Sequence, residues 1–133
     1  MRNLYSIDHC NTSDVRVIGK LKRNMLFYAY TYAMNSDVNH GRHCAIVLNE
    51  SWDNPVSISI NDRERHAEVG AIEAIPPHVD TEKFFIVVVR ATRTGKMTIS
   101  MPCNNCKAIL RGSGIKNCIY SSDHFKFKKC IIS

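Results

Sequence analysis

Residues 84–90, FFIVVVR, restrict the fold of this chain more than any other segment. Six apolar residues in a row, three of them valine, predict a β-strand. A strand that is apolar on both faces has to be covered on both, and in α/β proteins helices provide that cover. We therefore expect a central strand in a sheet that lies between two layers of helices.

The segments on either side supply strands and helices for this architecture. Apolar residues at positions 18, 21, 25, 28 and 32 have a 3-4-3-4 spacing, which predicts an amphipathic helix. Residues 65–75 predict a second helix that two prolines stop, and residues 103–111 predict a third that begins after a proline. Short β-prone runs occupy residues 44–49, 56–61, 117–122 and 125–132.

The distances between these elements predict how the sheet is ordered. The runs 44–49 and 56–61 are separated by ESWDNP, whose turn residues favour a hairpin. Only a few residues separate the last two strands, whereas a parallel pair needs a crossover of about a dozen or more. The C-terminal strand is therefore expected to be antiparallel, in a hairpin. The prediction is one three-layer α/β/α domain, residues 1–133, around a mixed five-stranded sheet.

Composition limits the environment and the partners. A chain of 133 residues that is 44% apolar suits a single globular domain. It has no apolar segment long enough to span a bilayer, and its first residues lack the apolar core of a signal peptide, so we expect a cytoplasmic protein with no membrane partner. In that environment six cysteines indicate metal ligands and buried thiols, not disulfides. The net charge of +6 favours anionic partners.

Two helix starts carry residues that bind metals. The order strand, helix, strand, helix, strand from residue 56 to 122 brings both helix starts to the carboxyl edge of one sheet. His66 lies at the first start, and Cys103 and Cys106 lie at the second. One imidazole and two thiols are three ligands, and a tetrahedral zinc ion (Zn²⁺) with three protein ligands keeps a fourth position for water. Glu68, two residues beyond His66, is then the candidate general base.

The segments HAEV (66–69) and PCNNC (102–106) resemble the H-x-E and P-C-x-x-C motifs of the zinc-dependent cytidine and deoxycytidylate deaminase superfamily. The resemblance extends over roughly residues 44 to 122 and implies the cytidine-deaminase-like form of the α/β/α fold. It also implies hydrolytic deamination, in which a zinc-activated water attacks C4 of a cytosine ring. Glu68 would carry a proton to N3 and then to the departing amine.

The same resemblance implies two substrate-binding positions. Asn61 follows the second predicted strand, where similar enzymes hold the sugar with an asparagine; a simple turn residue is the alternative. The backbone around Ala67 would help to seat the base. Related deaminases commonly assemble, so a homo-oligomer is also expected.

The substrate is open between branches of the superfamily. His66 is typical of deoxycytidylate deaminases, but these usually carry longer insertions than the four residues between Asn61 and His66. The predicted C-terminal hairpin resembles the enzymes that act on free cytidine. We expect cytidine, deoxycytidine or dCMP as the substrate. The alternatives are a deaminase that edits single-stranded RNA or DNA, and a non-catalytic zinc domain that binds a nucleotide.

Three other clusters have simpler interpretations. Arg63 and Arg65 could meet a phosphate, but arginines at helix starts are usually solvated. The segment HFKFKK (124–129) could stack on nucleic acid, but alternation in an edge strand predicts phenylalanines inward and lysines outward. The segment HGRHC (40–44) contains metal-ligand residue types, yet His43 and Cys44 would point to opposite faces of a strand.

Overall fold

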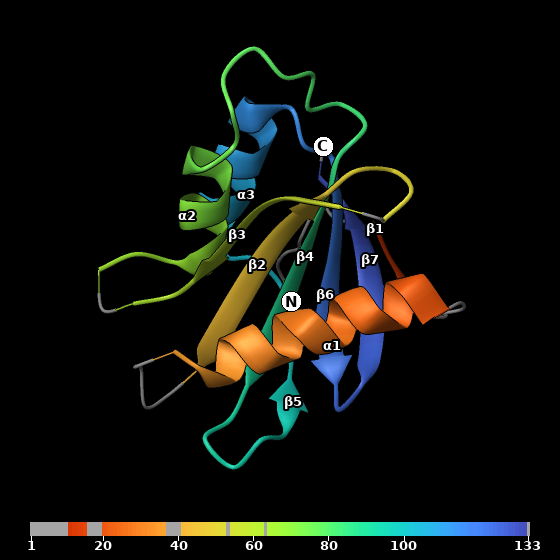
Figure 1. Ribbon diagram of the computed structural model, residues 1–133, viewed down its shortest axis with the longest axis vertical. Helices are drawn as coiled ribbons and strands as arrows, with labels where there is room; N and C mark the ends of the chain where they lie inside the picture. Colours follow the sequence, from red (N-terminus) through yellow and green to blue (C-terminus); the bar gives the residue numbers. More distant parts are fainter. Residues whose placement is uncertain (1–10, 16–19, 37–40, 53, 63, 133) are drawn as a thin grey trace, which may run out of the picture.

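The computed structural model of the protein describes residues 11–15, 20–36, 41–52, 54–62 and 64–132. In this part of the chain the elements follow one another as β1 (Asn11–Val15), α1 (Lys20–Met34), β2 (Arg42–Leu48), β3 (Pro55–Ile60), α2 (Ala67–Glu73), β4 (Phe85–Ala91), β5 (Met97–Thr98), α3 (Asn104–Ser113), β6 (Asn117–Asp123) and β7 (Lys126–Ile131). All strands belong to one sheet, in the order β1-β7-β6-β4-β2-β3, and the short β5 pairs with β4 (Figure 1).

The sheet is mixed, as predicted. Only β4 and β6 are parallel among the described pairs, and α3 makes the crossover between them. β6 and β7 form the predicted antiparallel hairpin. The five predicted strands are all present, and β1 and β5 extend the sheet. Neither addition has a strand-like sequence pattern, because β1 is the polar NTSDV, antiparallel to β7, and β5 is only two residues long.

The core lies on both faces of the sheet, and β4 contributes to both. Val87 and Val89 pack on the face that α1 covers, whereas Ile86 and Val88 pack on the face that α2 and α3 cover. All four side chains are buried. The prediction of a central strand covered on both sides is therefore confirmed, and Figure 1 shows α1 on one side of the sheet with α2 and α3 together on the other.

The first helix is present as predicted, but it buries a different face. The expected stripe included Met25, Tyr28 and Tyr32, whereas the fully buried residues are Leu26, Ala29 and Ala33, and Tyr28 is exposed. Small alanines let the helix backbone approach the sheet closely, whereas the larger Tyr28 and Tyr32 lie at its margin, where their hydroxyl groups are 3.2 Å apart at the surface.

Among the described residues, no helix combines the length and the apolar character that a membrane span requires.

The β6–β7 turn corrects one prediction about the segment 124–129. Phe127 points inward as expected and joins the core under α1. Phe125 does not, because it lies in the turn with φ +53° and 46% of its surface exposed. The left-handed region costs a residue with a side chain roughly 1–2 kcal/mol, which is why glycine or asparagine is usual there. Strand alternation ends at the turn, so the inward prediction for Phe125 was wrong. The prediction of an edge strand was also wrong, because β7 lies between β1 and β6.

The close packing of α2 on β3 depends on the absence of a side chain at Gly70. A Cβ atom there would overlap Ser59 Oγ and come within 3.0 Å of Ser59 Cβ, whereas a Cβ atom on Gly112 of α3 would meet nothing within 4 Å. We expect Gly70→Ala to lower the free energy of unfolding by about 1–3 kcal/mol. Gly112→Ala, which only adds helix propensity, should raise it by up to about 1 kcal/mol. Urea denaturation of both variants measures the difference; equal stability would contradict this packing.

Candidate active site

The two helix starts meet because of strand direction. β3 and β4 are both antiparallel to β2, so they run the same way and the chain leaves both at the same edge of the sheet. α2 follows β3 directly, whereas α3 follows β4 after the short β5, and the two helices contact each other. His66 is the N-cap residue of α2 and Cys103 is the N-cap residue of α3, both with extended backbone. The predicted convergence is therefore present.

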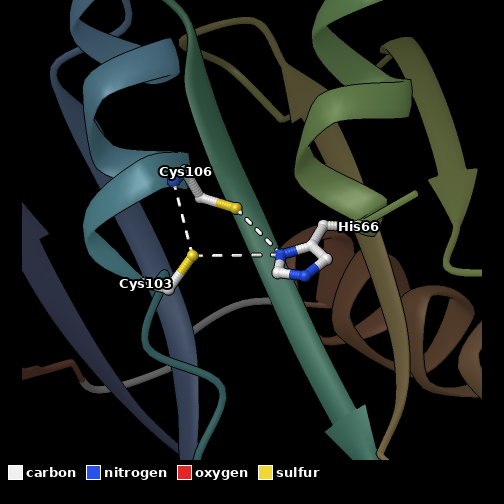
Figure 2. Close-up of side chains that lie close together, drawn as sticks. All are labelled: His66, Cys103 and Cys106. Carbon is white, nitrogen blue, oxygen red and sulfur yellow. Dashed lines mark hydrogen bonds between the residues drawn. The ribbon is translucent and has the colours of Figure 1, made fainter. Parts of the chain in front are cut away.

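Three ligand atoms come together at this point (Figure 2). His66 Nδ1 lies 3.2 Å from Cys106 Sγ and 3.9 Å from Cys103 Sγ, and all three atoms lie within 4.8 Å of one another. A tetrahedral zinc ion, with Zn–N near 2.0–2.1 Å and Zn–S near 2.3 Å, separates its N and S ligands by about 3.5 Å. The spacing and the ligand types therefore fit a zinc ion held by His66, Cys103 and Cys106.

The first turn of α3 presents both thiols to this point. The Cys106 backbone N–H donates to Cys103 Sγ over 3.5 Å, so that sulfur caps the helix. Cys103 is exposed and Cys106 is buried. Burial, reinforced by the nearby Glu68 carboxylate, raises the pKa of the Cys106 thiol. A metal ion therefore has to displace a firmly held proton from this ligand.

Glu68 lies in the first turn of α2 and is 5% exposed. Burial raises the pKa of its carboxyl group, and this effect outweighs the opposing contributions of its own backbone N–H, of His66 and of a hydrogen bond with Cys106. A carboxyl group with a raised pKa can hold and release a proton closer to neutral pH than an exposed one. Glu68 thus lies buried beside the candidate metal ligands, in surroundings that favour its protonated form.

A cavity of about 460 Å³ opens beside these residues. Its lining includes His66, Glu68 and Cys103, together with Asn61 from the end of β3. Of the residues predicted to form the site, Ala67 and Cys106 do not line this cavity. Ala67 is fully buried in the core, and Cys106 lines a second pocket of about 280 Å³ that His66 also lines. The role predicted for the Ala67 backbone stays a prediction.

The side chain of Asn61 holds two chain segments together. Its Oδ1 accepts hydrogen bonds from the backbone N–H of His43 (2.8 Å) and from Ser36 Oγ (3.0 Å). Its Nδ2 donates to the carbonyl oxygen of Gly41 over 2.9 Å. These bonds fix the amide at the cavity wall, and one N–H of Nδ2 is available beyond the Gly41 bond. A contact of Asn61 with a sugar stays a prediction.

His43 is a cavity residue that the sequence did not identify as part of this site. It lines the cavity, whereas its neighbour Cys44 is buried on the α1 side of the sheet, so the two do not form the alternative metal site, as expected. Burial and the nearby Arg90 guanidinium lower the pKa of His43 to about 4. The imidazole is therefore neutral at physiological pH. The sequence did carry a signal for this position, because His43 is two residues from Ala45 in a strand and therefore points to the same face of the sheet. His40, the other histidine of this segment, lies outside the described residues.

Ser100 and Met101 also line the cavity, and nothing in their sequence pattern pointed to them. The buried Ser100 hydroxyl lies 2.7 Å from Val88 O, to which it donates, and 2.8 Å from Ser121 Oγ. It therefore anchors the segment that leads to Cys103 onto both β4 and β6. This anchoring helps to set the position of the cysteine ligands.

Of the two arginines before α2 that could meet a phosphate, the structure describes only Arg65. Arg65 lines the cavity and forms an ion pair of 2.8 Å with Glu73, in which both side chains are about half exposed. Arg63 lies outside the described residues. A phosphate contact of Arg65 stays a prediction.

Comparisons with known proteins agree with the architecture. No protein-family model matches the sequence, and no curated protein is similar to it in sequence. Eleven chains of solved structures match. RibD of Acinetobacter baumannii (form 2) is similar with a TM-score of 0.53 and 14% identity, over 78% of this chain and 29% of that one. The chain thus spans less than a third of the RibD chain, and it has the mixed α/β, deaminase-like fold of that part.

The arrangement of ligands predicts which cysteines determine metal content. Cys106→Ala removes one of three ligands, so the purified variant should contain far less than one zinc per chain, whereas the wild type should contain about one. Cys44→Ala is the matched control, because that thiol is also buried but lies on the opposite face of the sheet. Elemental analysis after exhaustive dialysis measures the ratio; equal zinc in the two variants would contradict the site.

Metal affinity should depend on pH in a defined direction. Because burial raises the pKa of the Cys106 thiol, the metal-free protein keeps that proton at neutral pH, and zinc has to displace it. The zinc affinity should therefore rise about tenfold per pH unit for each displaced proton between pH 6 and 8, and fall as the pH is lowered. Competition with a chromophoric chelator measures this slope; an affinity independent of pH would exclude a protonated thiol ligand.

Proposed function

We propose that this protein is a zinc-dependent hydrolytic deaminase that converts a cytosine nucleoside or nucleotide to the uracil form and releases ammonia. The observation that carries the proposal is the buried Glu68 carboxyl group, in the wall of a cavity that is also lined by His66 and Cys103, two residues of the candidate metal cluster. The fold similarity to RibD supports the same class of protein. The H-x-E and P-C-x-x-C motifs are typical of zinc deaminases, and they therefore favour hydrolytic deamination as the reaction.

In such a reaction the candidate metal ligands and Glu68 would have different roles. Zinc, when held by His66, Cys103 and Cys106, supplies a Lewis acid that lowers the pKa of a water molecule. Glu68 would accept a proton from a water molecule that adds to C4, and would deliver this proton to N3 of the ring. It would then carry the proton of the added hydroxyl group to the amino group, so that the C4–N bond breaks and ammonia leaves. One water is consumed for each ammonia released, so atoms and charge balance.

The cavity is compatible with a small substrate. Its volume of about 460 Å³ is within the range typical of small-molecule sites. Asn61, held at the wall by Gly41 and His43, would donate to a sugar hydroxyl. The backbone at Ala67 would contact the base, and the neutral His43 imidazole offers a hydrogen bond without adding charge. Arg65 would meet a phosphate if the substrate is a monophosphate.

A deaminase that edits single-stranded nucleic acid is the second candidate. The net charge of +6 and the exposed positions of His66 and Cys103 at the cavity favour it. A non-catalytic zinc domain is a weaker alternative, because it has no use for Glu68. Burying a carboxyl group is costly, and a structural zinc site needs only its ligands.

One assay tests the proposal directly. Zinc-loaded protein is incubated with cytidine, deoxycytidine, their monophosphates and a cytosine-containing oligonucleotide, and both uracil formation and ammonia release are measured. Turnover of a nucleoside or nucleotide with the oligonucleotide unchanged supports the first candidate, and the reverse supports the second. If no cytosine compound releases ammonia, the proposal of a cytosine deaminase fails.

The role of Glu68 gives a specific expectation for its variant. Glu68→Gln keeps the shape of the side chain but removes its ability to carry a proton, so kcat should fall by at least about 100- to 10,000-fold. Zinc content should remain near one per chain, because Glu68 is not a ligand. Glu82→Gln, at an exposed carboxylate outside the cavity, is the control and should keep full activity. Unchanged activity in Glu68→Gln would assign the proton transfer to another group.

A further inference from the structure

A cluster of aromatic rings lies at one end of the sheet, away from the metal ligands. Phe125 of the β6–β7 turn lies 5.4 Å from Tyr30 of α1 and 4.8 Å from His124, between ring centroids. Tyr30 lies 6.1 Å from Phe27 on the same helix. We call Phe27, Tyr30, His124 and Phe125 the aromatic patch. Figure 1 shows α1 crossing the sheet near the end where β5 and the β6–β7 turn lie.

Two rings of the aromatic patch, those of Phe27 and Phe125, are exposed and lie outside the buried core. Phe27 is 58% exposed and Phe125 is 46% exposed. Phe125 also holds φ +53°, a conformation that glycine or asparagine adopts more easily. The core contact of this hairpin comes from Phe127, which is buried. Phe125 therefore adds nothing to the buried core, and about half of its surface is open to a partner outside the chain.

Hydrogen bonds hold the aromatic patch against the neighbouring turn 92–96. The Tyr30 hydroxyl donates to the carbonyl oxygen of Gly95 over 2.5 Å, and the Met97 backbone N–H donates to His124 Nδ1 over 3.0 Å. The turn is itself closed by backbone bonds between Thr92 and Lys96 and between Gly95 and Thr92. The rings and the two turns thus form a preorganised surface.

The charged residues of the two turns are mostly basic. Arg93 and Lys96 lie on the turn 92–96, and Lys126 follows Phe125. All three are exposed, and Asp123 is the one carboxylate on these two turns. The surface therefore combines flat rings with three positive charges against one negative charge.

We propose that this surface binds single-stranded nucleic acid. A single strand offers a flat base and a phosphate in each repeating unit, so the rings can stack on bases while Arg93 and Lys96 contact phosphates. A wholly apolar partner would leave these cations without counter-charges, and an acidic peptide would lack flat faces for the rings. The surface contains no metal ligand and no residue of the cavity, so the inference goes beyond the proposed deaminase activity and stands or falls separately.

The experiment measures binding of the full zinc-loaded chain to fluorescently labelled dT12 and rU12 by anisotropy. Phe125→Asn removes the ring and suits the left-handed conformation, so the variant should fold with thermal stability close to the wild type. It should bind the oligonucleotides about 5- to 150-fold more weakly, the range for loss of one stacked base. Val79→Asn, at an exposed apolar residue away from the patch, should bind as the wild type does.

A pair of charge-matched double variants separates local contacts from net charge. The double variant Arg93→Gln, Lys96→Gln should bind the oligonucleotides more weakly. Each lost phosphate contact reduces the slope of log affinity against log salt concentration by about 0.7, so the loss of two contacts should make this slope about 1.4 less steep. Lys83→Gln with Lys116→Gln, at exposed sites before β4 and β6, lowers the net charge equally and should leave the slope unchanged.

Several results would overturn the proposal. These are no binding by the wild type, full binding by Phe125→Asn, or equal loss in the two double variants. Concentration-dependent dimers that Phe125→Asn dissociates, without oligonucleotide binding, would make the surface a self-interface. Binding to anionic vesicles that depends on Phe125, without oligonucleotide binding, would make it a membrane contact. Equal affinity for dT12 and rU12 would support stacking on bases without recognition of the sugar. Because Glu68 lies in the separate cavity, Glu68→Gln should bind the oligonucleotides as the wild type does.

Discussion

β2 lies between β3 and β4 and runs antiparallel to both, and the rest of the candidate site depends on this pairing. It makes β3 and β4 run in the same direction, so the helices that follow them begin at one edge of the sheet. Successive side chains of β2 point to opposite faces of the sheet. Cys44 enters the core under α1, whereas His43 reaches the cavity wall. A change in the register of β2 by one residue would exchange these two environments.

The chemistry of the site follows from what surrounds each ionisable group. Burial raises the pKa of Glu68 and of Cys106, and it lowers the pKa of His43. In all three cases burial disfavours the charged form of the side chain, because the interior solvates charge poorly. A zinc ion changes this balance at Cys106, since it stabilises the thiolate and offsets the cost of burying it. The candidate site thus combines the neutral imidazole of His43 with two groups, Glu68 and Cys106, whose charge would depend on what is bound.

The site and the aromatic patch occupy different parts of the same sheet. The candidate metal ligands lie at the starts of α2 and α3, whereas the aromatic patch lies where α1 approaches the turns 92–96 and 123–126. An oligonucleotide on the aromatic patch and a small substrate in the cavity would therefore make independent contacts. The basic residues on the two turns account for part of the excess of positive charge over the whole chain.

Local patterns in the sequence determined the three helices, the five main strands, and the candidate site residues His66, Glu68, Cys103 and Cys106. The helices and strands follow patterns that repeat over a few residues, and the site residues lie in two motifs with spacings of two and three residues, so period and spacing record them. That His66 lies beside the cysteines depends on the sheet, because Cys103 follows it by 37 positions in the chain. Only the tertiary structure decided which face of α1 is buried, that β1 and β5 extend the sheet, that His43 and Ser100 line the cavity, and that Phe125 is exposed. Each of these depends on contacts between segments distant in the chain, where packing and strand pairing outweigh local preference.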